Sequence, residues 1–179
     1  MQAVEDKQAK KQHRPHLPVN IKNDKDWDCY GMFEVKGGKQ TLYLNINVLT
    51  DISLRFHALE SVIHEGRHAL QYKIVSQDKL PFFAFRAKKW KKNWQGYISN
   101  NENVTAYGMQ SVERDAQKYT MIELERLKFK YRNEGDFEKT FSALEKRYTS
   151  TKDKARKEFG VFYNYKINKK IDRKIQNSK

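Results

Sequence analysis

The sequence predicts an α+β fold in which a small N-terminal β-hairpin or sheet packs on a mainly helical domain. Residues 30–36 and 39–48 alternate apolar and polar side chains with the period of a β-strand, on either side of Gly37-Gly38. After residue 50 the apolar side chains instead recur at helical spacing, as expected for four or five helices. A chain of 179 residues, of which 38% are hydrophobic, is large enough to form one domain with a sizeable core.

The N-terminal residues 1–22 are polar and basic and contain Pro15 and Pro18. We expect a flexible arm outside the core, because the segment offers few apolar side chains to bury. The core is then predicted to span residues 23–131. Residues 132–179 are predicted to form a basic helical C-terminal extension of the same domain.

The glycine pair suits a two-residue hairpin turn, which needs positive φ. A first long helix is predicted to begin at Thr50 or Asp51, which are good N-cap residues, and to end at about Ser76. Its apolar side chains form one stripe, which the sheet is expected to cover.

His64 and His68 are four residues apart on this predicted helix. Both imidazoles therefore lie on one face, one turn apart, and can reach a single zinc ion. Glu65 follows the first histidine, where its carboxylate can take a proton from metal-bound water. His57 precedes His64 by seven residues, a rise of about 10 Å. That rise is too large for a shared ion, so we expect His57 at the surface or beside the site.

The segment 77–103 begins with a helix breaker and then interleaves aromatic residues, among them Phe82 and Phe83, with Lys and Arg. No acidic residue occurs between Pro81 and Ser99. Two interpretations stay open: an amphipathic helix whose aromatic rings enter the core, or a basic surface that binds nucleic acid or an anionic membrane.

A second long helix is predicted over 104–131 and carries Tyr107, Glu113 and Asp115. Further helical spacing follows from residue 137, and Gly160 separates it from a final helix over 161–176.

The order His64-Glu65-x-x-His68 resembles the motif of the zincin metallopeptidases. The stretch around Glu113 is similar to the second motif of the gluzincins, in which a Glu on a later helix is the third zinc ligand. The resemblance implies a Zn²⁺ ion bound by His64, His68 and Glu113, with Glu65 as the general base. It also implies that the edge of the hairpin pairs with an extended substrate, a role compatible with a sheet that covers the helix.

Three further roles follow from this resemblance. Asp115 departs from the gluzincin pattern, and we expect it to accept a hydrogen bond from a ligand histidine. Tyr107 is expected to donate to the oxyanion of the reaction. Glu102 is the alternative third ligand.

The function predicted on these grounds is a zinc metallopeptidase, an endopeptidase acting on a protein or peptide. One alternative is a basic protein that binds nucleic acid or membranes on a degenerate zincin scaffold. Another is an interaction or immunity protein on a retired peptidase scaffold. The compact basic chain is also similar to toxin domains of bacterial polymorphic toxins and to small metallopeptidases of phages and mobile elements, so a cognate inhibitor or immunity protein is an expected partner.

The formal charge of +14 favours acidic partners, so we also expect weak contact with polyanions through the basic segments. The single cysteine, Cys29, excludes an internal disulfide framework. There is no apolar run of transmembrane length and no apolar signal-peptide core. We therefore expect a cytoplasmic protein, or one exported without a cleaved signal peptide.

Overall fold

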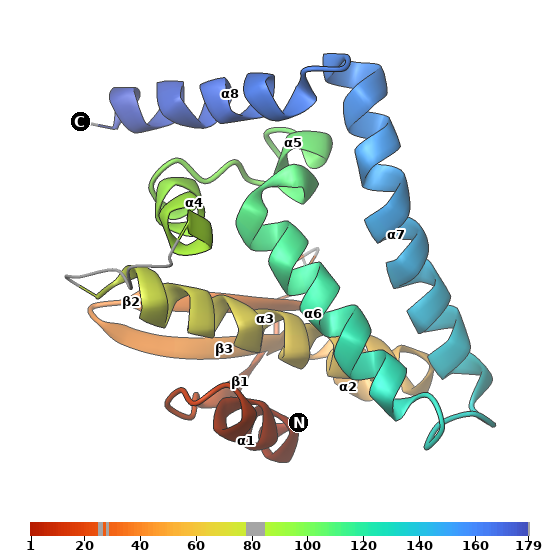
Figure 1. The fold of residues 1–179 in the computed structure, drawn as a ribbon. Coiled ribbons are helices and arrows are strands. Elements are labelled where there is room, and N and C mark those ends of the chain that lie inside the picture. The colour runs from red at the N-terminus through yellow and green to blue at the C-terminus, as the bar shows by residue number, and fades with distance from the viewer. Residues whose placement is uncertain (25–26, 28, 78–84, 179) are drawn as a thin grey trace.

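The computed structural model describes residues 1–24, 27, 29–77 and 85–178, and its fold is the predicted α+β fold (Figure 1). A small sheet lies at one side of a mainly helical body. The strands are β1 (Val19–Lys22), β2 (Gly31–Lys36) and β3 (Lys39–Asn45). The helices are α1 (Gln2–Lys11), α2 (Asn47–Thr50), the 3₁₀ helix η1 (Ile52–Leu54), α3 (Arg55–Val75), α4 (Phe85–Gln95), α5 (Val104–Met109), α6 (Ser111–Leu127), α7 (Gly135–Phe159) and α8 (Tyr163–Asn177).

The predicted hairpin is confirmed as strands β2 and β3, which pair antiparallel. Gly37 and Gly38 form the turn with φ of +55° and +77°, a region that glycine enters without steric cost. The second strand ends at Asn45 rather than at residue 48, because the Asn45 side chain accepts a hydrogen bond from the Asn47 amide and α2 begins there. The sheet order is β1-β3-β2, so β2 is an edge strand.

The prediction of a flexible N-terminal arm is wrong. Helix α1 packs on α3, and β1 adds a parallel strand to β3, with Val19 opposite Leu42. Polar contacts hold this segment: Glu5 is fully buried and paired with Arg14, and Gln8 donates to Glu123. Hydropathy cannot detect such a helix, because its interface buries the polar side chains of Glu5 and Gln8 in place of an apolar stripe.

Helix α3 begins four or five residues later than predicted. The Asp51 carboxylate does cap a helix, but it accepts from the Ser53 amide at 2.8 Å and so caps η1 instead of α3. The end of α3 at Val75 agrees with the prediction.

The predicted helix over 104–131 is two helices, because the backbone breaks at Gln110 with ψ of 143°. The Gln110 side chain accepts from the Ile98 amide at 2.9 Å and donates to the Ile98 carbonyl at 2.8 Å. This buried pair of hydrogen bonds fixes the start of α6.

Helix α4 supports the prediction of an amphipathic helix with aromatic rings in the core. Trp90 is buried, while Lys88, Lys89 and Lys91 are exposed. Phe82 and Phe83 lie outside the described residues.

Helices α7 and α8 agree with the predicted C-terminal helices, and Gly160 between them has φ of +77°. Figure 1 shows α7 beside α6, and α8 crossing near α4 and α5. Two apolar clusters join these helices to the body. The first holds Phe56, Leu59, Ile63, Leu124, Phe137, Phe141 and Leu144, and the second holds Ile98, Ala106, Ala155, Tyr163, Ile167 and Ile171. No described helix is both long enough and apolar enough to cross a membrane.

Candidate metal centre

Helices α3 and α6 pack together and bring three donor side chains to one point. His64 and His68 come from successive turns of α3, and Glu113 comes from the first turn of α6. The Nε2 atoms of the two histidines are 3.1 Å apart. Glu113 Oε2 lies 3.4 Å from His64 Nε2, and Glu113 Oε1 lies 3.3 Å from His68 Nε2. These three residues form a group that could hold a metal ion.

The spacing of the donors suits a tetrahedral zinc ion. With bonds of about 2.0–2.1 Å, tetrahedral coordination separates neighbouring donor atoms by about 3.3–3.4 Å. The observed separations of 3.1, 3.3 and 3.4 Å lie close to that value. Glu113 Oε2 is also fully buried and accepts no hydrogen bond. A buried carboxylate oxygen of this kind needs a partner, and a cation would supply one.

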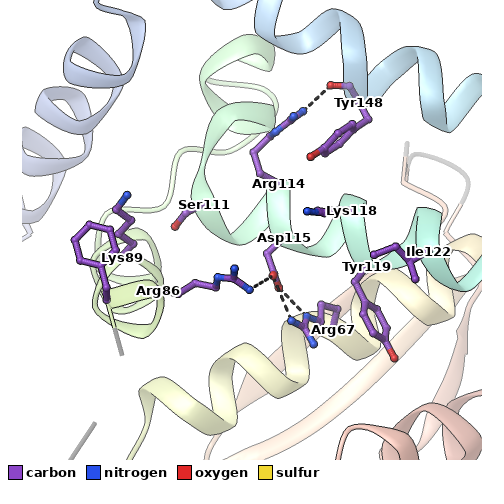
Figure 2. A pocket seen from close by; sticks show the side chains of 11 residues that line it. Arg67, Arg86, Lys89, Ser111, Arg114, Asp115, Lys118, Tyr119, Ile122 and Tyr148 are labelled. Atoms are coloured by element: carbon purple, nitrogen blue, oxygen red, sulfur yellow. Dashed lines mark hydrogen bonds and ion pairs between the residues drawn. The ribbon is translucent and has the colours of Figure 1, made fainter. Parts of the chain in front are cut away.

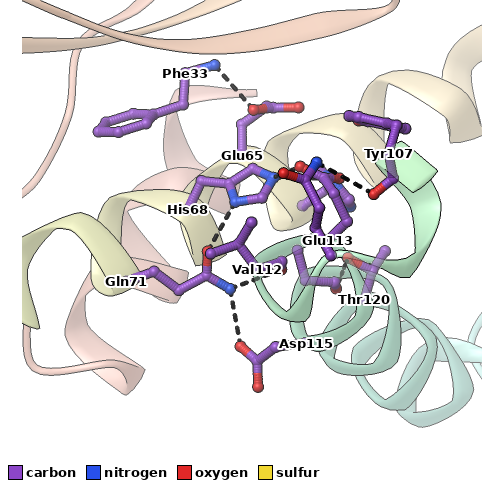
Figure 3. Close-up of polar contacts among 12 residues, drawn as sticks. Phe33, Glu65, His68, Gln71, Tyr107, Val112, Glu113, Asp115 and Thr120 are labelled. Carbon is purple, nitrogen blue, oxygen red and sulfur yellow. Dashed lines mark hydrogen bonds and ion pairs between the residues drawn. The ribbon is translucent and has the colours of Figure 1, made fainter. Parts of the chain in front are cut away.

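Gln71 sets the orientation of the His68 ring (Figure 3). The Gln71 amide nitrogen donates to the Val112 carbonyl at 2.9 Å and to Asp115 Oδ2 at 3.0 Å. Its Oε1 atom must therefore face His68 Nδ1, which lies 2.9 Å away and donates to it. With the proton on Nδ1, the lone pair of His68 Nε2 points toward the donor cluster.

The expected contact between Asp115 and a histidine is not present, because Gln71 lies between them. Asp115 instead accepts from Arg67 Nε at 2.6 Å and from the Gln71 amide. The sequence analysis missed Gln71, although its position three residues after His68 places it on the same helix face.

Tyr97 was also missed as a partner of the site. Its hydroxyl donates to Glu113 Oε1 at 2.7 Å. Burial, and then the negative charge of Glu113, raise the pKa of Tyr97, so the hydroxyl keeps its proton. Tyr97 follows α4, and no spacing in the sequence relates it to α6.

In the metal-free protein, His68 and Glu113 form a buried ion pair. Burial alone would lower the pKa of His68, but the Glu113 carboxylate outweighs it and raises that pKa to about 9. Burial alone would raise the pKa of Glu113, yet the charge of His68 and the close ring nitrogens of both histidines hold that pKa well below its ordinary range. A cation that binds here must displace the proton of His68.

Glu65 projects from α3 toward the edge strand. Its Oε2 atom accepts from the backbone amide of Phe33 in β2 at 2.9 Å. The close approach of strand and helix depends on Gly31, because a Cβ there would lie 2.9 Å from the Cβ of Ser61. The sheet therefore fixes both the position and the orientation of the Glu65 carboxylate.

Two cavities flank the donors and share Glu65 and Tyr107 among their lining residues. One, of about 350 Å³, includes His68 and the aromatic side chains of Phe33 and Trp94. The other, of about 420 Å³, includes His64 and is more polar, with Glu60 and Arg147 in its wall. Together they form a cleft between the edge of β2, α3 and the loop after Tyr97.

The remaining predicted residues fall in three different places. Tyr107 lines the cleft, and burial together with the charges of Glu113 and Glu65 raises its pKa, so it remains a hydrogen-bond donor. Glu102, the alternative ligand, is bound to Lys174 and Ser99 and is not part of the cluster. His57 lies 3.2 Å from Glu60 and outside the donor group, in agreement with the expectation from helix rise.

Comparison of the chain with protein-family models, with curated proteins and with solved structures finds no match.

Proposed function

We propose that this chain is a zinc-dependent metallopeptidase that cleaves peptide bonds within proteins or peptides. The observation that carries the proposal is the convergence of His64 Nε2, His68 Nε2 and the Glu113 carboxylate within 3.1–3.4 Å of one another, beside Glu65 in a cleft. Two histidines and one carboxylate are the protein ligands of a catalytic zinc site that keeps a position open. The burial and fixed rotamers of these side chains favour a preorganised site.

A zinc ion bound by these residues supplies a Lewis acid that polarises a carbonyl group and lowers the pKa of water. Glu65 acts as general base: it accepts a proton from the attacking water and delivers it to the leaving amine. The hydrogen bond from the Phe33 amide occupies its Oε2 atom and leaves Oε1 for this proton. Tyr107 keeps its hydroxyl proton and donates to the developing oxyanion.

The edge of β2 binds the substrate backbone in extended form. Gly31, Met32 and Phe33 line the cleft beside Glu65, and β2 has a neighbouring strand on one side only. An extended peptide can add to such an edge through main-chain hydrogen bonds other than that of the Phe33 amide, which donates to Glu65. The aromatic cavity at His68 then receives an apolar substrate side chain, and the polar cavity at His64 receives a polar one.

The test compares the native protein with Glu65→Gln on a diverse peptide library, with cleavage read by mass spectrometry. The substitution keeps the shape of the side chain and removes the base. We expect cleavage to fall by about 10²–10⁴-fold, the usual contribution of a general base, with zinc content unchanged. Glu125→Gln, an exposed change on α6, serves as the matched control and should cleave like the native protein. Equal cleavage by native protein and Glu65→Gln would contradict the mechanism.

The alternative of a basic protein that binds nucleic acid or membranes on a degenerate zincin scaffold is supported by the net charge of +14. It makes a different prediction in the same experiment. Native protein and Glu65→Gln would both hold zinc, and neither would cleave any peptide.

A further inference from the structure

A cavity of about 520 Å³ lies apart from the donor cluster (Figure 2). Residues from α3, α4, α6 and α7 line it. Five of them are cationic and one is acidic, namely Arg67, Arg86, Lys89, Arg114, Lys118 and Asp115. We refer to this cavity as the cationic pocket.

Among the described residues, most of this positive charge is not neutralised by a carboxylate. Arg67 donates to both oxygens of Asp115, at 2.6 and 3.2 Å, and Arg86 lies 3.7 Å from the same carboxylate. Within the described part of the chain, no ion pair joins Lys89, Arg114 or Lys118 to a carboxylate. The pocket therefore has an excess of four positive charges, and one acid is shared between two arginines.

Two of the guanidinium groups are held in place before any ligand arrives. Arg114 donates to the Tyr148 carbonyl at 2.6 Å, and its guanidinium lies 3.6 Å from the centre of the Tyr148 ring. Arg67 is forked on Asp115 and lies 4.7 Å from the centre of the Tyr119 ring. Such fixed, stacked guanidinium groups lose little freedom when they bind an anion.

We propose that the cationic pocket binds a small ligand that carries phosphate groups. A concave wall of one charge sign concentrates the electrostatic field, and guanidinium groups match the geometry of phosphate oxygens. The charges come from three helices and converge on one cavity instead of following a line along the surface. This arrangement favours a compact phosphomonoester or bisphosphate over the extended backbone of a nucleic acid.

The test uses isothermal titration calorimetry of the full chain with inorganic phosphate and with a sugar bisphosphate. We expect saturable binding at one site per chain, tighter for the bisphosphate. Lys89→Glu/Lys118→Glu should weaken binding by about tenfold or more, because two charge-assisted contacts are lost and reversed. Lys88→Glu/Lys91→Glu is the matched control. It removes and reverses the same number of charges, partly on the same helix, at exposed positions outside the pocket, and should change affinity less than about twofold.

Oligonucleotides of increasing length and vesicles containing phosphatidylserine form the remaining arms of the experiment. Affinity that is the same for both double variants, or no saturable binding of either phosphate probe, would overturn the proposal. Tight binding only to long oligonucleotides would assign the pocket to nucleic acid, and tight binding only to vesicles would assign it to a membrane. Either of these results would also overturn the small-ligand proposal.

Discussion

Arg14 of the N-terminal segment lies directly against Gly66, in the middle of the helix that carries both histidines. A Cβ at Gly66 would be 2.6 Å from Arg14 Nη2, so the glycine leaves the space that the guanidinium fills. Arg14 is also paired with Glu5, and the two side chains are 1% and 0% exposed. The segment before the sheet thus packs its own buried ion pair directly against the helix of the candidate metal centre.

The first prediction concerns this ion pair. Arg14→Met should lower the free energy of unfolding by about 3–5 kcal/mol, because it leaves the Glu5 carboxylate buried without a partner. The double variant Glu5→Met/Arg14→Met should recover most of that loss, since no charge remains buried. Urea unfolding followed by circular dichroism measures both. A loss below about 1 kcal/mol for the single variant would show that Glu5 is solvated or protonated in the folded protein.

The second prediction concerns metal content. The native chain should bind one zinc ion, and alanine at His64, His68 or Glu113 should abolish stoichiometric binding and lower thermal stability. His57→Ala is the matched control, because His57 is on the same helix but outside the donor group. Elemental analysis after gel filtration gives the stoichiometry. Equal zinc content in all four variants would assign the ion to another site.

The third prediction concerns Gln71, which orients His68. Gln71→Met keeps the volume but removes the acceptor for His68 Nδ1, so zinc affinity should fall by about 10–100-fold. Competition with a chromophoric chelator measures the affinity. Gln8→Met is the control, since it removes a buried glutamine whose hydrogen bonds go to Glu123 and Tyr119 and not to a predicted zinc ligand. If both variants lose zinc affinity equally, the loss results from general destabilisation of the fold and not from the orientation of His68.

The fourth prediction concerns pH. In the metal-free protein the pKa of His68 is raised to about 9, against about 6.5 for the unfolded chain. The folded state therefore binds this proton more tightly, so its stabilisation is complete below about pH 6.5 and is lost as pH rises through about 9. The free energy of unfolding of metal-free protein should fall across this interval by up to about 3 kcal/mol.

Zinc reverses that trend, because the ion requires His68 without the proton on Nε2. Zinc affinity should therefore rise over the same pH interval. Urea titrations at several pH values, with and without zinc, measure both trends. A metal-free stability that is flat between pH 6.5 and 9 would contradict the buried ion pair with Glu113.

The sequence was sufficient to predict those parts of the site that lie close together in the chain or follow a known spacing. His64, Glu65 and His68 share one helix, so helix geometry alone relates them. Glu113 was selected through resemblance to a second motif, and the structure brings it to the two histidines. The hairpin and the C-terminal helices were predictable because apolar periodicity and glycine turns mark them.

The remaining features depend on polar contacts between distant segments, which leave no periodic pattern. The Gln110 side chain bonds to the backbone of Ile98 and so breaks a helix that propensity alone would continue. Tyr97 reaches Glu113 from another helix–loop segment, and Asp115 is drawn away from His68 by Arg67. Helix α1 is packed mainly through Glu5 and Gln8, residues that hydropathy assigns to solvent.

The contacts of α1 also determine the order in which the protein can assemble during synthesis. Gln8 bonds to Glu123 and Tyr119, which follow it by 115 and 111 residues. At roughly 5–20 residues per second, a ribosome needs about 6–23 seconds to make that intervening chain. The hydrogen bonds between α1 and α6 can therefore form only after α6 has been made, whereas α1 can pack on α3 earlier. Because Glu113 also belongs to α6, the donor cluster of His64, His68 and Glu113 cannot be complete before synthesis has passed that helix.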